Sequence, residues 1–145
     1  MLEIDAVNHV GIRIRDKEAS LDFYEGLGFA LLADAGFAEG HPIIMKHPSG
    51  VVLNLLGPAT VTDGANVLMD IEEKHPGITH VALTISSLAK ARKFLADRGV
   101  EITGSFAFGQ MSAISIRDPD RNVIELDAYD TQADQDGAAY RSHAR

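Results

Sequence analysis

The chain repeats itself at a spacing of 71 residues, and the alignment of the two copies needs no gap. Residues 8–14 align with residues 79–85, and residues 47–55 align with residues 118–126 in the same register. Repeated units of this kind constrain a fold more strongly than composition does, because each copy must form the same supersecondary structure. We therefore expect two copies of one structural unit, packed as one protein.

The repeat also places side chains that can bind metal at equivalent positions. His9 matches His80, and Asn54 matches Glu125, each at a separation of 71 residues. Imidazole and carboxylate groups suit divalent Zn, Fe, Mn, Ni or Co, and a site with few protein ligands leaves positions open for substrate or water. A single histidine on a strand is usually a surface residue, but two at equivalent positions together with a glutamate favour a metal site.

Composition narrows the class of protein. At 145 residues, with 46% hydrophobic residues, the chain is expected to form one globular domain. We find no apolar run long enough to span a membrane and no secretory signal at the start. The chain has no cysteine, and its formal net charge of −8 argues against a nucleic-acid partner. A cytoplasmic protein without membrane or nucleic-acid partners is expected.

Each copy has the pattern β-α-β-β-β, which predicts an α+β fold of two tandem βαβββ modules. Within a single domain, 1–145, we expect module 1 at 5–57, a linker at 58–77, module 2 at 78–128 and a polar tail at 129–145, which is frayed or lies on a partner. Asp16 can cap the first helix and Ser86 or Ser87 the second, with Gly28 and Gly99 ending them. The expected strands are 7–14, 29–33, 41–46, 51–56, 78–85, 100–103, 112–117 and 123–128.

Alternation along the strands predicts what each sheet face carries. Apolar residues such as Ile12 and Leu83 point to one side, where the helices can cover them. If each sheet curls, the other side becomes a cleft with converging polar groups: His9, Arg13, Asn54, His80, Thr84, Glu125 and Asp127. A second interpretation is a hydrogen-bonded Glu125–His80 pair that holds the two copies together.

Other residues have weaker signals. Arg13 can hold an anionic group of a substrate, or it can form a salt bridge with Asp127. Phe37, Phe106 and Phe108 lie near glycine-containing loops, where they can form an apolar cap over a small organic ligand or contact a second subunit.

Four stretches, at 8–12, 23–29, 80–83 and 118–126, resemble the glyoxalase/bleomycin-resistance/dioxygenase group, also called the vicinal oxygen chelate superfamily. The resemblance covers about residues 5–128 and implies two βαβββ modules that form a curled mixed sheet. It also implies one divalent metal per site, held by His9, His80 and Glu125, with Asn54 at the fourth position. A small-molecule substrate and a homodimer are implied as well, and in some members both subunits build the metal site.

Two positions depart from well-known members. Members resembling glyoxalase I carry Glu, Gln or His at the fourth position, where a carboxylate takes part in the proton shuttle. Asn54 is an amide and cannot act as a base. Ring-cleaving dioxygenases typically have a tyrosine three residues before the Asp-Pro pair, and here that residue is Ser115. We therefore assign Asn54, Arg13 and Ser115 to substrate binding or to support of the ligands.

The resulting functional hypothesis is a divalent-metal-dependent enzyme of the glyoxalase-like lyase or isomerase type. Glu125 would be both a ligand and the catalytic carboxylate, and the metal would act as a Lewis acid on a substrate with neighbouring oxygens. The alternatives are an extradiol-type dioxygenase and a non-catalytic small-molecule-binding protein of the bleomycin-resistance type.

Overall fold

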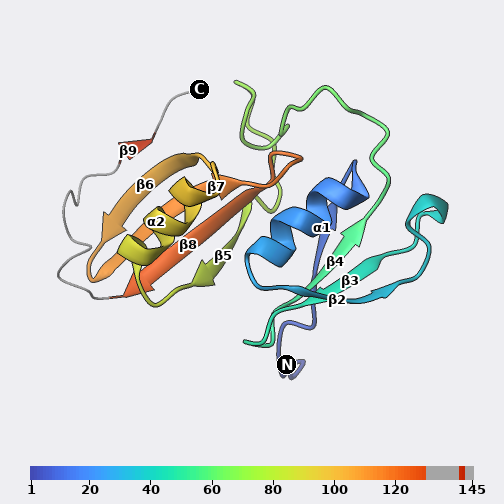
Figure 1. Cartoon of the computed structure of the whole chain (residues 1–145), viewed down its shortest axis with the longest axis horizontal. Coiled ribbons are helices and arrows are strands. Elements are labelled where there is room, and N and C mark those ends of the chain that lie inside the picture. The colour runs from blue at the N-terminus through green and yellow to red at the C-terminus, as the bar shows by residue number, and fades with distance from the viewer. Residues whose placement is uncertain (130–140, 143–145) are drawn as a thin grey trace. The chain divides into compact units, whose positions relative to one another are not determined.

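The computed structural model describes residues 1–129 and 141–142 and divides the chain into two compact units, Met1–Gly64 and Ala65–Arg145 (Figure 1). The boundary falls inside the predicted linker. We use module 1 and module 2 for the sheet and helix of the first and second unit. Among the residues that the structure describes, no helix is both long and apolar enough to cross a membrane.

Module 1 is a mixed four-stranded sheet with one helix across one of its faces (Figure 1). The strand order is β1-β4-β3-β2, with β1 parallel to β4 and the remaining neighbours antiparallel. The elements are β1 (Val10–Arg13), α1 (Lys17–Gly26), β2 (Ala30–Asp34), the short 3₁₀ helix η1 (Phe37–Glu39), β3 (Ile43–Lys46) and β4 (Val52–Leu56).

The local sequence explains why α1 begins and ends where it does. The Asp16 side chain accepts a hydrogen bond of 2.9 Å from the Ala19 amide, as predicted for an N-cap. The helix closes at Leu27, and Gly28 follows with φ of +100°, a conformation that favours glycine. Its apolar side packs on the sheet with a core made of Ile12, Ile14, Leu21, Tyr24, Phe29, Ile43, Met45, Leu53 and Leu55.

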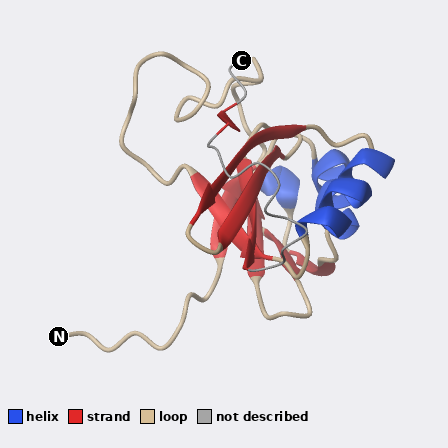
Figure 2. Cartoon of the chain, turned by 90° about the vertical axis from the view of Figure 1, so that its left-hand side faces the viewer, coloured by secondary structure: helices blue, strands red, loops and turns tan. Residues whose placement is uncertain are grey.

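Module 2 repeats this arrangement with one more strand. The strand order is β5-β8-β7-β6-β9, with β5 parallel to β8, and α2 lies across one face (Figures 1 and 2). Ser87, rather than Ser86, caps α2. The elements are β5 (His80–Thr84), α2 (Leu88–Asp97), β6 (Ile102–Phe108), β7 (Met111–Arg117), β8 (Val123–Tyr129) and β9 (Arg141–Ser142).

The 71-residue repeat is preserved in the strand register. Gly11 of β1 pairs with Asn54 of β4, and Ala82 of β5 pairs with Glu125 of β8. Even the irregularities match, because β2 has a bulge between Leu31 and Ala33 and β6 has one between Ile102 and Gly104. The prediction of two βαβββ modules with a common register is confirmed.

Two sequence-based expectations need correction. Strand β6 does not end at Thr103 but continues to Phe108, so Phe106 and Phe108 belong to a strand rather than to a loop cap. The tail starts later than expected, since Tyr129 ends β8, and residues 141–142 pair with β6; its remaining residues lie outside the described part of the chain.

Asp70 joins the linker to module 2 through charged side chains. Its carboxylate lies 3.0 Å from Arg117 Nη2 and 2.7 Å from Arg121 Nε. It also accepts a hydrogen bond from the Asn66 amide. Although burial opposes ionisation, these contacts outweigh it and lower the pKa of Asp70 to about 2. We call Asp70, Arg117 and Arg121 the linker clasp.

Candidate metal centre

The polar face of module 2 is the sheet side opposite α2, and the strand register defines its members. Because partners across a sheet ladder point to the same side, Ser115 of β7 shares this face with Glu125 of β8, and Gly104 of β6 shares it with Ser115. The neighbouring ladder row is Phe106, Ala113 and Asp127. Strand β5 adds His80, Ala82 and Thr84.

His80 and Glu125 are neighbours on this face. His80 is diagonal to Glu125 across the parallel β5–β8 ladder, and His80 Nε2 lies 3.5 Å from Glu125 Oε2. This separation is at the long limit of a hydrogen bond. The Glu125 side chain is only 12% exposed, whereas that of His80 is 41% exposed. The pair thus connects two strands of module 2, and not the two copies as the alternative interpretation expected.

Both predicted histidine ligands have the same hydrogen-bonded arrangement. His9 Nδ1 lies 2.7 Å from Asn8 Oδ1, and His80 Nδ1 lies 2.9 Å from Thr79 Oγ1. An imidazole whose Nδ1–H donates to a side-chain oxygen presents a lone pair on Nε2, which is how metal-bound histidines are commonly oriented. Sequence reasoning missed these anchors, although polar residues preceding both histidines at the 71-residue spacing were a usable signal.

Glu125 lies in an environment that disfavours its charge. Burial is the main cause and the Asp127 side chain is the second, and together they raise the pKa of Glu125 from 4.5 to about 7. Asp127 is itself only 9% exposed, and among the residues that the structure describes its Oδ1 has no hydrogen-bond partner. A buried carboxylate pair with an unsatisfied oxygen is costly for a protein, and a bound cation relieves that cost. The residues of module 2 therefore fit a divalent metal.

The corresponding face of module 1 has different chemistry. Asn54 is half-buried on β4 and pairs with Gly11 on one side and Ile44 on the other. The position equivalent to Asp127 is Leu56. Arg13 is exposed at the end of β1 on the same side as Asn54. Module 1 thus offers an amide and a cation where module 2 offers two carboxylates.

The predicted ligand set includes residues of both units. Across residues 1–129 and 141–142, no group of three or more His, Cys, Asp or Glu side chains is gathered as a metal site. His80 and Glu125 are together in module 2, whereas His9 is exposed just before β1 in the other unit. Convergence of His9 with this pair, within one chain or across a dimer, stays a prediction, as does the Arg13–Asp127 alternative.

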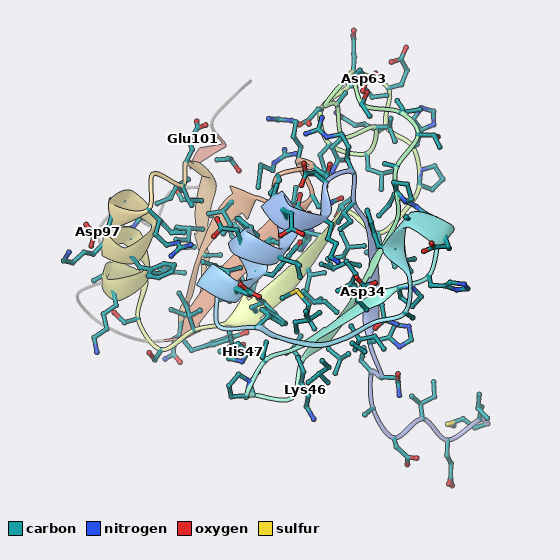
Figure 3. All side chains as sticks on the ribbon, turned by 45° about the vertical axis from the view of Figure 1, so that its right-hand side comes forward. Asp34, Lys46, His47, Asp63, Asp97 and Glu101 are labelled. Atoms are coloured by element: carbon teal, nitrogen blue, oxygen red, sulfur yellow. The ribbon has the colours of Figure 1, made fainter. Side chains whose placement is uncertain are left out.

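Phe37 and His47 each contact residues of module 1. Phe37 packs over Gly57, where a methyl group would lie 2.2 Å from the ring, so it belongs to the packing of module 1. His47 follows Lys46 at the turn after β3 (Figure 3), with its ring 5.3 Å from that of Phe29.

The chain has two βαβββ modules with a common register, a histidine at the start of the first strand of each, and a glutamate on β8. Comparison with known sequences gives the family. The sequence model of the Glyoxalase/Bleomycin resistance protein/Dioxygenase superfamily matches residues 6–126. The chain belongs to this superfamily. It is also 27% identical over 140 residues to the Glyoxalase domain-containing protein RDO1 of Mycosarcoma maydis, with 88% of this chain and 70% of that protein covered.

Solved structures agree with this fold. A glyoxalase family protein from Enterococcus faecalis superposes with a TM-score of 0.68 at 22% identity, covering 84% of this chain and 96% of that one. TnmS3, an antibiotic binding protein from Streptomyces sp. CB03234, gives a TM-score of 0.66 at 24% identity, covering 90% of this chain and 100% of that one. At these identities the likeness establishes the fold, which the vicinal oxygen chelate resemblance predicted.

Proposed function

We propose that the protein is a divalent-metal-dependent enzyme of the lyase or isomerase type that acts on a small organic substrate with neighbouring oxygen atoms. The observation that carries this proposal is the contact of His9 and His80 with a neighbouring side-chain oxygen through Nδ1, together with Glu125 beside His80. In the tautomer with the proton on Nδ1, each Nε2 has a lone pair for a metal. We further propose a cytoplasmic homodimer.

The proposed roles follow from the chemistry of each side chain. His9, His80 and Glu125 would hold the metal, which supplies Lewis acidity when bound. Glu125 would also be the carboxylate that takes or returns a proton of the substrate. Asn54 would donate a hydrogen bond to a substrate oxygen. Arg13 would attract an anionic group, and Ser115, directly across the ladder from Glu125, would position that carboxylate or the substrate.

A second candidate is a small-molecule-binding protein without catalysis. It is favoured by the similarity to an antibiotic binding protein and by the lack of a gathered metal cluster in the part of the chain that the structure describes. An extradiol-type dioxygenase is supported less well, because Ser115 stands where such enzymes have an acid–base tyrosine and a hydroxyl of serine does not titrate near neutral pH.

Metal content separates the first two candidates. The full chain, purified without chelator or histidine tag, should contain or take up one equivalent of divalent metal, measured by elemental analysis and by titration calorimetry with Zn, Mn, Co and Ni. His80→Ala should lose stoichiometric uptake. His75→Ala is the matched control, because this exposed histidine lies in the linker. Wild-type protein that takes up no metal would favour the binding protein, and equal uptake by His80→Ala would remove His80 from the site.

A further inference from the structure

We propose that Asn8 and Thr79 are positioning residues for the two predicted histidine ligands, and that they act in different ways. Asn8 holds His9 in the one tautomer that can bind a metal through Nε2, whereas Thr79 allows His80 to change its tautomer when a metal is bound. This inference rests on the proposed function and deepens it, since it names the residues that prepare each imidazole for the metal.

The contact of Asn8 with His9 determines which ring nitrogen carries the proton. Asn8 Oδ1 lies 2.7 Å from His9 Nδ1. An amide oxygen only accepts hydrogen bonds, so this contact is a hydrogen bond only when the proton is on Nδ1. His9 Nε2 then presents a lone pair, and His9 can bind a metal without any change of tautomer.

The contact of Thr79 with His80 is compatible with either tautomer. Thr79 Oγ1 lies 2.9 Å from His80 Nδ1. A hydroxyl donates or accepts by rotating its hydrogen while the oxygen stays in place, whereas an amide has to turn over to make the same change. Thr79 therefore keeps its hydrogen bond whichever ring nitrogen of His80 carries the proton.

The carboxylate next to Nε2 is the reason that His80 needs this freedom. His80 Nε2 lies 3.5 Å from Glu125 Oε2, and two acceptors that face each other without a proton between them repel. In metal-free protein with Glu125 ionised, the ring proton is therefore on Nε2, and the Thr79 hydroxyl donates to Nδ1. When Nε2 and Glu125 hold a cation, the ring proton has to be on Nδ1 instead.

The corresponding position of module 1 has no carboxylate to compete for the ring proton. The residue equivalent to Glu125 is Asn54, whose amide is uncharged. Asn8 and Thr79 are repeat equivalents as well, so their difference accompanies the difference between Asn54 and Glu125. A fixed tautomer suits the histidine of module 1, and an adjustable tautomer suits that of module 2.

Long-range proton–nitrogen NMR spectra of the imidazole rings distinguish the tautomers, with assignments from His9→Gln and His80→Gln variants. At about pH 8.5 imidazoles are neutral and Glu125 is above its pKa of about 7, so titration does not enter the comparison. The metal-free full chain should show Nδ1–H for His9 and Nε2–H for His80. One equivalent of Zn should move the His80 proton to Nδ1 and leave His9 unchanged. His75, an exposed linker histidine, is the reference for an unconstrained ring.

Substitutions test the two positioning residues separately. Asn8→Ala should give His9 the tautomer mixture of His75 and weaken Zn binding about 10-fold in competition with a chelator, whereas Asn8→Asp retains an acceptor oxygen and should retain the tautomer. Thr79→Val removes the hydroxyl at nearly constant volume and should weaken Zn binding by a similar factor, and Thr79→Ser should restore it. Thr60→Val, at an exposed residue of the linker, is the matched control and should bind Zn like the wild type.

The wild-type spectra decide each role on its own. Nε2–H on His9, or the tautomer mixture of His75, in metal-free protein would overturn the role of Asn8. Nδ1–H on His80 before Zn is added, or a His80 ring that stays unchanged when Zn binds, would overturn the role of Thr79. Wild-type protein that binds no Zn would overturn the proposed metal-dependent function instead, and the metal-free spectra would still decide both tautomers.

Discussion

Module 1 and module 2 share a backbone plan but have very different polar faces. The register of β1 on β4 is reproduced by β5 on β8, residue for residue at a 71-residue offset. On the face opposite the helix, however, module 1 has Asn54, Leu56 and Ile44 where module 2 has Glu125, Asp127 and Ser115. The helix-facing core maintains the fold in both copies, so the other face is free to diverge, and module 2 carries the carboxylates.

The two modules also differ in the contacts that stabilise them. The linker clasp binds module 2, and the module 1 residues equivalent to Arg117 and Arg121 are Lys46 and Gly50, which cannot form it. The edge strand β6 is paired with β9, whereas all five residues of β2, the equivalent edge strand, are exposed. The module with the more costly buried charges is therefore also the one with additional contacts.

The largest expected effect comes from giving the polar face of module 1 the carboxylate that module 2 has at the equivalent position. The wild-type protein should show no efficient isomerisation of the glutathione hemithioacetal, because Asn54 cannot act as a base. Asn54→Glu supplies that carboxylate, and the rate should rise by about 100-fold or more, the usual contribution of a general base. The assay uses protein loaded with Ni, Zn, Co or Mn.

Lys46→Glu is the control for added charge, since Lys46 is exposed on β3 and points to the same face as Asn54. It should leave the rate unchanged. A strong wild-type rate would show that the base lies elsewhere in the chain and that our interpretation of Asn54 is mistaken.

Breaking the linker clasp should distinguish the stabilities of the two modules. Asp70→Asn removes a charge that lies between two arginines and is 12% exposed. We expect a loss of about 2–3 kcal/mol in the free energy of unfolding, between the values typical of exposed and of buried ion pairs. Urea unfolding measures the loss, and amide hydrogen exchange locates it.

The loss of protection should be confined to module 2. Glu73→Gln, at an exposed residue of the same linker, serves as the control and should change little. Equal loss of protection in both modules would mean that the clasp stabilises more than the unit to which it belongs.

The pH dependence of stability should come from module 2 as well. The folded pKa of Glu125 is about 7, above its ordinary value of 4.5, so folding favours the protonated form. In metal-free protein this contribution is fully present below about pH 4.5 and is lost as the pH rises through 7. The Tm of the wild type relative to Glu125→Gln should therefore fall between pH 5 and pH 8 in the presence of EDTA.

Asn54→Gln should track the wild type across the same pH range, because neither amide titrates. A Tm difference between wild type and Glu125→Gln that stays constant from pH 5 to pH 8 would contradict the raised pKa.

The smallest effect concerns the glycines that end the two helices. Gly28 and Gly99 are repeat equivalents with φ of +100° and +68°, and alanine at either position costs about 1–2 kcal/mol. A methyl group on Gly28 would also lie 3.0 Å from His47 Nε2, whereas one on Gly99 would meet no described residue within 4 Å. Gly28→Ala should therefore be the more destabilising variant in urea unfolding, by about 1 kcal/mol. A larger loss for Gly99→Ala would show that backbone strain differs between the copies.

The sequence predicts those features of the structure that follow from residues close together in the chain. The repeat and the alternation of Ile12 and Ile14 with His9 and Arg13 were sufficient for the modules, the helix caps and the faces of β1 and β4. The extension of β6 was missed, because the bulge at Thr103 interrupts the period-two pattern. Contacts between residues distant in sequence, such as Asp70 with Arg117, have no local signature. The convergence of His9 with Glu125 would be a contact of the same kind, and it stays a prediction.

The bulge in β6 changes which residues of the strand face each side of the sheet. Before it, Ile102 pairs with Ile116 and points to the helix side; after it, Gly104 pairs with Ser115 and points to the side of Glu125. Because the bulge absorbs Thr103 as an extra residue, Phe106 is directed toward the side of Glu125 and Ala107 toward α2. If Thr103 were instead paired in a regular ladder, the two side chains would exchange faces, whereas deletion of Thr103 would leave both where they are. A bulge of this kind thus lets a strand accept a single-residue insertion while the residues beyond it keep their faces.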